Sequence, residues 1–325
     1  MPFALLQTLK MQDELMKKNS ILKKYTVIGL VLCSVFCFAC SCVDVVPGTI
    51  RESAEGDSRT QILETSKRED LTTEENKNPS GEDFISPTPQ NGTDIFHKGF
   101  GDNENYVVVI DAGHQDHGMN EKEPNAPGSS LMKTQLTSGT QGIVTRIPEY
   151  ELTLAISLLL RDELLKSGYT VVMVRETNDV NISNIGRALI ANKYKPSDEN
   201  NYKECINVRI HANGFDSPNM RGALMYCCTS ANPYEVGKYY DESVMLANLI
   251  LDNYCNFTSM PKYKNPILYG DDMTGTNWSE VPTTIIELGF MSNEEDDRMM
   301  AEDKYRKNAA KGMKAGIDLY FTRDK

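Results

Sequence analysis

The sequence lacks the patterns that mark nucleotide enzymes and nucleic-acid-binding proteins. Its 325 residues contain neither a GxGxxG nor a GxxxxGK[ST] motif, so the two common glycine-rich phosphate loops are absent. The formal net charge is -12, whereas a nucleic-acid-binding surface needs a basic footprint. No HExxH motif is present, which disfavours the common helical zinc-protease class. We therefore expect no nucleic-acid partner.

Cysteines outside the amino-terminal segment are few, and their spacing matches no zinc ribbon. Cys205, Cys227, Cys228 and Cys255 are expected to be buried free thiols, although a disulfide remains open in an exported domain. The other four of the eight cysteines lie in or beside an apolar run near the amino terminus. The sequence therefore points away from a cysteine-based metal site.

The amino-terminal segment resembles a signal or membrane anchor. Residues 25–39 form an apolar run behind several lysines, with the length of a signal-peptide core and short of the ~20 residues of a comfortable transmembrane helix. Cys40 or Cys42 resembles an acylated lipoprotein cysteine, and an uncleaved anchor helix is the alternative. The basic flank places the rest of the chain outside the cytoplasm in either case, so we expect a membrane-tethered protein.

Composition divides the chain into three parts. Residues 1–46 form the signal or anchor segment with its basic flank. Residues 47–104 are rich in Ser, Thr, Glu, Asp, Asn and Pro, and such a segment buries too little apolar surface to offset its ordering entropy. We interpret it as a disordered acidic linker. Residues 105–325 are the expected folded domain.

The pattern of this domain predicts the α/β class. Strand-like runs, rich in β-branched residues, alternate with segments of helical periodicity, which predicts a single, mostly parallel, twisted sheet with helices on both faces. The expected strands are residues 107–110, 170–174, 205–210, 223–227 and 282–288. The expected helices are residues 149–166, 183–194, 235–254 and 304–320. An insertion at 115–148, rich in Gly, Ser, Thr and Pro, is expected either to lie over the rim of a functional site or to be a surface excursion.

Two histidines directly follow predicted strands. His114 and His211 are thus expected at the carboxyl ends of strands, where functional groups gather in open α/β sheets. Gly113 is expected to permit the turn that aims His114, and Asp111 to orient its ring. His117 is an alternative ligand or a solvated loop residue. Two histidines with a carboxylate are the usual ligands of a hydrolytic zinc centre.

Three glutamates are candidates for the carboxylate roles. Glu149 and Glu151 both lie in the first turn of a predicted helix, where the helix dipole favours an anion even without a functional role. Glu287 interrupts the apolar run TTIIELGF, and a carboxylate there should have a raised pKa, as a general base needs. The alternative for Glu287 is a buried ion pair with Arg175 or Arg209.

Four motifs taken together resemble one known family. The runs VVIDAGH (108–114), PEYEL (148–152), IHAN (210–213) and IELGFMSN (286–293) resemble the zinc-dependent N-acetylmuramoyl-L-alanine amidases of type 3, with order and spacing kept from about residue 106 onward. The resemblance implies one Zn²⁺ bound by His114, Glu149 and His211, with Glu287 as the catalytic residue. It also implies cleavage of the amide bond between N-acetylmuramic acid and L-alanine.

The resemblance implies peptidoglycan as substrate, a bacterial extracytoplasmic location at the membrane or cell wall, and possible control by an unknown protein activator. The sequence departs from the family where QDHG follows the first histidine in place of the common Gly-Gly-x-Asp-x-Gly run, and where the loop before Glu149 is long. Two alternatives stay open: a catalytically silent peptidoglycan-binding or regulatory protein on the same fold, and a zinc carboxypeptidase.

Overall fold

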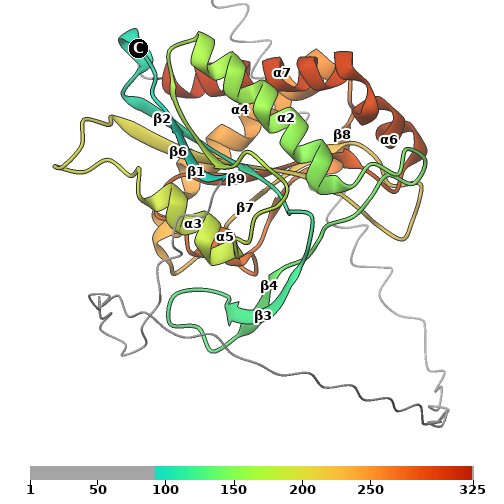
Figure 1. Ribbon diagram of the computed structural model, residues 1–325, viewed down its shortest axis with the longest axis horizontal. Coiled ribbons are helices and arrows are strands. Elements are labelled where there is room, and N and C mark those ends of the chain that lie inside the picture. Colours follow the sequence, from blue (N-terminus) through green and yellow to red (C-terminus); the bar gives the residue numbers. More distant parts are fainter. Residues whose placement is uncertain (1–91, 324–325) are drawn as a thin grey trace, which may run out of the picture. The chain divides into compact units, whose positions relative to one another are not determined.

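A computed structural model of the protein describes residues 92–323 (Figure 1). The predicted signal or anchor segment and most of the predicted linker lie outside the described residues. Within residues 92–323, no helix has both the length and the apolar composition that a membrane span requires.

The domain is built on a seven-stranded sheet in the order β1-β5-β2-β6-β9-β7-β8 (Figure 1). The four inner strands β5, β2, β6 and β9 are parallel, β7 and β8 are parallel to each other, and β1 and β7 pair antiparallel with β5 and β9. This confirms the predicted α/β class with a mostly parallel sheet. The strands of the sheet are β1 (Thr93–His97), β2 (Tyr106–Ala112), β5 (Thr170–Arg175), β6 (Glu204–Asn213), β7 (Ala223–Cys227), β8 (Lys262–Tyr269) and β9 (Thr283–Phe290).

Helices cover both faces of the sheet (Figure 1). Helices α2, α4 and α7 pack on one face and α3 on the other, as the membership of the two apolar clusters shows. The helices are η1 (Gly101–Asn103), α2 (Glu149–Lys166), α3 (Asn184–Asn192), η2 (Glu235–Tyr239), α4 (Tyr240–Thr258), α5 (Thr274–Asn277), α6 (Glu294–Ala301) and α7 (Asp303–Phe321).

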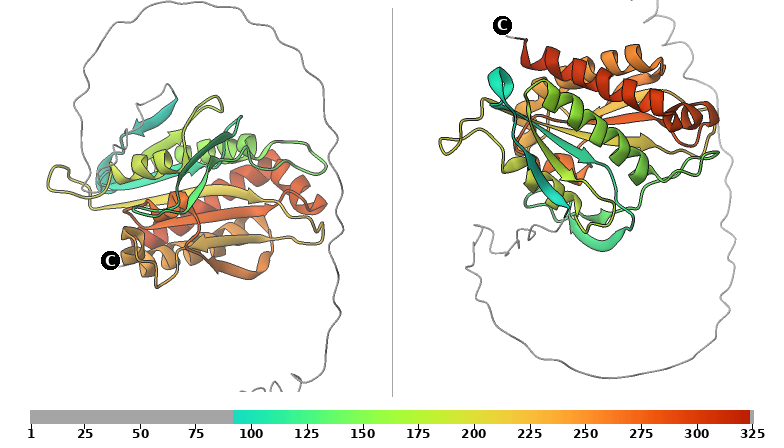
Figure 2. Two further views of the ribbon diagram at one scale, coloured as in Figure 1. Left: turned by 90° about the horizontal axis from the view of Figure 1, so that it is seen from below. Right: turned by 45° about the horizontal axis from the view of Figure 1, so that its top comes forward.

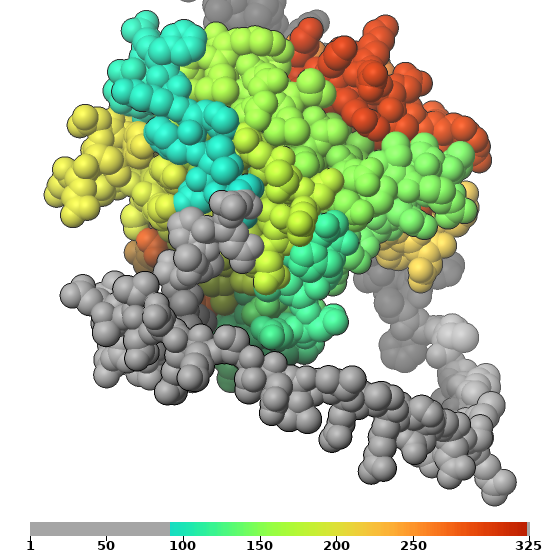
Figure 3. Space-filling model, in the orientation of Figure 1, coloured from blue at the N-terminus to red at the C-terminus, as the bar shows by residue number. Residues whose placement is uncertain are grey.

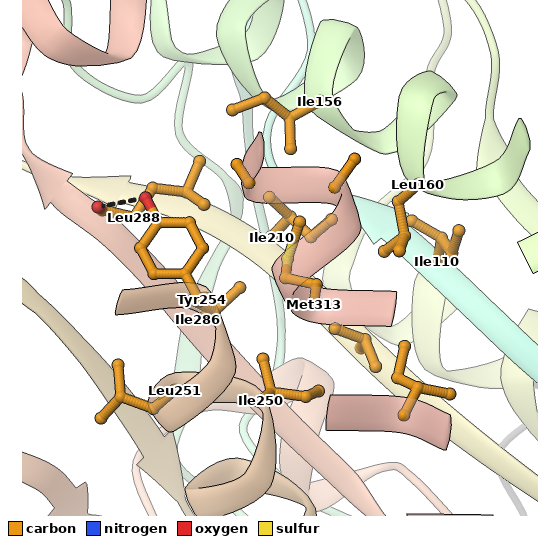
Figure 4. Packing of buried hydrophobic residues seen from close by; sticks show 14 of the residues in the cluster. Ile110, Ile156, Leu160, Ile210, Ile250, Leu251, Tyr254, Ile286, Leu288 and Met313 are labelled. Atoms are coloured by element: carbon orange, nitrogen blue, oxygen red, sulfur yellow. Dashed lines mark hydrogen bonds between the residues drawn. The ribbon is translucent and has the colours of Figure 1, made fainter. Parts of the chain in front are cut away.

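Strand β2 is buried on both faces, which explains its unbroken apolar run. Val108 and Ile110 belong to the larger cluster with α2, α4 and α7, whereas Val107 and Val109 belong to the smaller cluster with α3. Side chains alternate across a strand, so a strand covered on both faces needs apolar residues at every position. Figure 4 shows the larger cluster, in which Ile110 lies beside residues of α2. This packing fixes the strand that ends at the predicted site.

The folded region differs from the sequence prediction in several places. Strand β1 lies inside the predicted linker and pairs with β5, so this part of the linker is ordered. The predicted helix 235–254 is divided into the 3-10 turn η2 and the helix α4. Strand β8 and helices α5 and α6 were not predicted, because their sequences are short or polar.

The insertion at 115–148 contains a two-stranded hairpin of β3 (Met119–Pro124) and β4 (Met132–Leu136). Figure 3 shows this hairpin on the surface of the folded region, in green. Polar contacts join it to α5 and to the residue after that helix: Asn277 Nδ2 donates to the Asn125 carbonyl, and Trp278 Nε1 donates to the Pro124 carbonyl. The insertion is therefore a fixed part of the domain.

Candidate metal centre

Three neighbouring parallel strands bring the predicted site residues to one edge of the sheet. His114 follows β2, His211 lies in β6 and Glu287 lies in β9. The left view of Figure 2 shows β6, in yellow, between β2 and the orange-red β9. His211 pairs directly with Glu287 in the ladder. The carboxyl ends of parallel strands meet at one edge, so sequence positions far apart converge there.

Three candidate ligand atoms form a triangle with equal sides. His114 Nε2, Glu149 Oε1 and His211 Nδ1 lie 3.2 Å from one another in all three pairs. A tetrahedral ion with bonds of about 2.0–2.1 Å to nitrogen and oxygen places its ligands about 3.3 Å apart. The spacing of these three side chains therefore fits the ligands of a tetrahedral divalent cation.

The hydrogen bonds of His114 and Glu149 leave lone pairs of these two groups facing the centre of the triangle. His114 Nδ1 donates to the Thr137 carbonyl at 2.7 Å, so its Nε2 is left as an acceptor. Glu149 Oε2 accepts from the Thr140 amide and Oε1 from the Ala212 amide, at 3.0 and 3.1 Å. Acceptors that face one another at this distance repel unless a proton or a cation lies between them. The donor set and its orientation fit a bound metal ion.

Electrostatics favour the forms of these groups that bind metals. Burial lowers the pKa of His211 to about 4, which keeps the ring neutral near pH 7. Burial alone would raise the pKa of Glu149, but its contacts with His114 and His211 outweigh burial and hold the pKa well below its usual range. Metal ligands must be deprotonated, so both groups are in the required state.

The helix that begins at Glu149 separates the two competing glutamates. Pro148 precedes the first turn in an extended conformation, and the Glu149 amide donates to the Thr140 carbonyl. Glu149 is 3% exposed and points to the triangle, whereas Glu151 is exposed. The geometry thus brings Glu149, and not Glu151, to the two histidines.

His117 lies outside the triangle. It contacts Asp116, and with Asp179 these residues form a separate, solvent-exposed group. Exposed polar side chains of this kind normally form hydrogen bonds with water. The position of His117 therefore fits a solvated loop residue, which was one of its two expected roles.

Glu287 faces the same cleft without an ion-pair partner among the described residues. Burial, followed by the nearby charge of Glu149, raises its pKa well above the usual range, and Arg209 opposes this shift only in part. Its Oε2 has no hydrogen-bond partner among residues 92–323. The alternative of an ion pair is not seen: Arg209 Nε donates to Asp111 at 2.8 Å, and Arg175 donates mainly to backbone carbonyls.

The expected role of Asp111 was wrong. Its two oxygens accept from Arg187 and Arg209 at 2.6 and 2.8 Å, beneath the site. The group that orients the ring of His114 is instead the carbonyl of Thr137, in the insertion. A backbone carbonyl has no signature in the sequence, so this residue could not be found from residue types.

The expected role of Gly113 also needs correction. The left-handed residue of the turn is His114, with φ 59°, while Gly113 is not among the residues with positive φ. A Cβ atom on Gly113 would lie 2.5 Å from Cε1 and 2.6 Å from Nδ1 of His211. Glycine is required at this position because the second histidine ring packs directly against it.

The triangle and Glu287 lie in one cleft of about 450 Å³. The insertion forms one part of its lining through Thr137, Gly139 and Thr140, so the structure places the insertion at the rim. The remaining lining residues are Ala212, Asn213, Gly214, Phe215, Asp216 and Ser292. Sequence reasoning missed Gly214, Phe215 and Asp216, whereas the other three lie within the quoted motifs.

Fold and site together define a class: an α/β protein with two histidines and one carboxylate at the carboxyl edge of its sheet, in a group that could hold a metal ion. A family model described as N-acetylmuramoyl-L-alanine amidase matches residues 108–318. The chain belongs to this family, and it is a peptidoglycan amidase, a hydrolase.

Individual relatives agree with the family match. A germination-specific N-acetylmuramoyl-L-alanine amidase of Bacillus subtilis is 26% identical over 185 residues, which cover 54% of this chain and 72% of the relative. An N-acetylmuramoyl-L-alanine amidase of Mycobacterium tuberculosis is 27% identical over 220 residues, or 65% of this chain and 84% of the relative. The apo structure of the amidase Ami1 from Mycobacterium abscessus matches with a TM-score of 0.58 at 25% identity, covering 67% of this chain and 99% of Ami1.

Proposed function

We propose that the protein hydrolyses the amide bond between N-acetylmuramic acid and L-alanine in a zinc-dependent reaction. The observation that carries the zinc requirement is the 3.2 Å triangle of His114, Glu149 and His211. These three side chains would hold the ion. Zinc, when bound, polarises a carbonyl group and makes bound water more acidic.

Glu287 is proposed as the group that moves the proton. Two observations support this role: Glu287 lines the same cleft as the three ligands, and its Oε2 has no hydrogen-bond partner among the described residues. It accepts a proton from the water that attacks the amide carbon and delivers it to the leaving nitrogen of L-alanine. The carbon–nitrogen bond breaks, and the products are a lactyl carboxylate on the sugar and a free stem peptide.

The proposed setting of the reaction is the outside of a bacterial membrane. The basic flank and apolar run within residues 1–46 support an anchor or lipoprotein signal, and the acidic composition of the linker supports a spacer that reaches the cell wall. Because β1 is ordered, the linker is proposed to end near residue 92. A protein activator is the further partner proposed for this setting.

Product analysis with and without a chelator tests the proposed function. We expect the protein to release intact stem peptides with a free L-alanine amino group from purified peptidoglycan. Treatment with a chelator is expected to reduce the release to background, and added zinc is expected to restore it. The reason is that the proposed reaction needs the bound metal to polarise the amide carbonyl. Mass spectrometry of the soluble products gives the measurement.

The same experiment separates the alternatives. A silent binding protein would release nothing while it still sediments with the cell wall. A carboxypeptidase would release single amino acids and leave the amide to muramic acid intact. Release of whole stem peptides that a chelator does not affect would refute the zinc requirement while leaving the amidase activity in place.

Substitution of Gly113 by alanine is expected to weaken zinc binding by about tenfold or more, because the new methyl group displaces the ring of His211. Gly270→Ala is the matched control, since a Cβ there meets only Asp272 Oδ1 at 3.1 Å, far from the ligands in sequence. Competition with a chromophoric chelator measures both affinities. Equal affinities in the two variants would show that the ring of His211 tolerates the displacement and would contradict the role given to Gly113.

A further inference from the structure

The backbone turn that carries His114 is held from beneath by buried arginine side chains. His114 has φ 59°, a left-handed conformation that is uncommon for a residue other than glycine. Such a conformation persists where the surroundings fix it. The carbonyl groups of Ala112, Gly113 and His114 all accept hydrogen bonds from guanidinium groups.

Arg175 connects the backbone beside two of the candidate ligands. Its Nη2 donates to the carbonyl of Gly113 at 3.1 Å and to the carbonyl of Tyr150 at 2.8 Å. Gly113 directly precedes His114, and Tyr150 directly follows Glu149. One planar group thus joins the end of β2 to the first turn of α2.

The surroundings of Arg175 are unusual for a buried cation. The side chain is 0% exposed, and among the described residues no carboxylate lies within ion-pair distance of it. Asp111 pairs instead with Arg187 and Arg209. Burying a charge without an opposite charge is costly unless its donors are satisfied, and here they are satisfied by neutral oxygens. An apolar side chain would avoid this cost but could not bridge the two segments.

Arg187 completes the support of the turn from α3. Its Nη1 donates to Asp111 and to the carbonyl of Ala112, and its Nη2 donates to the carbonyl of His114 at 2.8 Å. Of the two segments, Arg187 therefore contacts only the turn of His114, whereas Arg175 contacts both the turn and the helix that begins at Glu149. The two arginines differ in what they can fix.

We propose that Arg175 is a positioning residue for the metal centre, which sets the distance between His114 and Glu149. The inference rests on the proposed zinc site. Groups that orient metal ligands are typically worth about 10–100-fold in metal affinity. Lysine cannot replace the planar guanidinium, because one ammonium group does not reproduce its fixed fork of donors.

The test is the zinc affinity of the full-length Arg175→Lys protein, measured by competition with a chromophoric chelator. We expect about 10–100-fold weaker binding of zinc, with a metal-free protein that keeps its circular dichroism spectrum and a cooperative unfolding transition. Arg161→Lys is the matched control: Arg161 lies on α2, is partly exposed and bonds Glu176 and Asp162. Its affinity for zinc is expected to equal that of the wild type.

A folded Arg175→Lys protein with wild-type zinc affinity would overturn the inference. If that variant does not fold, Thr153→Val replaces it, since the Thr153 hydroxyl donates to the Gly113 carbonyl at 2.9 Å and accepts from Arg175 at 3.3 Å. A severalfold loss of zinc affinity supports the positioning role, and unchanged affinity overturns it. Wild-type protein that binds no zinc would instead refute the proposed function, so the two failures are distinguishable.

Discussion

Replacement of Glu287 by glutamine is expected to lower the release of stem peptides by about 10²–10⁴-fold while the amount of bound zinc stays the same. Glutamine keeps the size of the side chain, but its amide cannot accept a proton from the attacking water. Glu287 contributes no atom to the 3.2 Å triangle, so zinc should bind without the Glu287 carboxylate. The expected result is an intact metal centre without proton transfer.

The measurement pairs a rate of product release from purified peptidoglycan with metal analysis of the same protein. Glu151→Gln is the matched control, because it makes the same chemical change at an exposed position two residues from Glu149. We expect the control to keep its rate within about twofold, as surface substitutions usually do little. Full activity of Glu287→Gln would refute its catalytic role, and loss of zinc would mean that Glu287 is a ligand.

The parallel core of the sheet was predictable because burial on both faces leaves a strong pattern. The run at 107–110 predicted β2, and the run at 205–210 predicted β6, since strands covered by helices need apolar residues at every position. The start of α2 after Pro148 and the cap of α3 at Ser183 were predictable for the same kind of local reason, and Ser183 accepts from the Gly186 amide as a cap does.

The edges of the sheet were not predictable, because edge strands are exposed and tolerate polar residues. Strand β1 has the sequence TDIFH, and its pairing with β5 depends on tertiary contacts. Strand β8 contains two lysines and a proline, which argue against a strand in local terms although they are common at an edge. The antiparallel direction of β7 has no local signal, since Ala223–Cys227 would form a strand in either orientation.

The site was predictable to the extent that its chemistry lies in side chains. His114, His211 and Glu287 stand out because polar residues end or interrupt apolar strands. The contacts of Thr137 and Thr140 with the ligands were invisible, because a backbone carbonyl and a backbone amide make them. The sequence therefore could not predict the backbone hydrogen bonds that orient the ligands, because these depend on how the insertion folds back onto the sheet.

Substitution of His114 by alanine is expected to weaken zinc binding by more than about 100-fold and to abolish activity. Loss of a direct ligand should cost more than loss of a group that only orients one, for which 10–100-fold is typical. Two ligands, Glu149 and His211, would remain, too few for the three-ligand site of a catalytic zinc. Zinc content after dialysis against a weak chelator, together with the chelator-competition affinity, gives the measurement.

His117→Ala is the matched control. It removes the same kind of side chain at an exposed position, three residues after His114. We expect this variant to keep both its zinc and its activity. The reverse result, with zinc kept in His114→Ala and lost in His117→Ala, would place the metal in the exposed group with Asp116 and Asp179. That group lies on the surface and does not line the cleft with Glu287, so a metal bound there could not serve the proposed reaction.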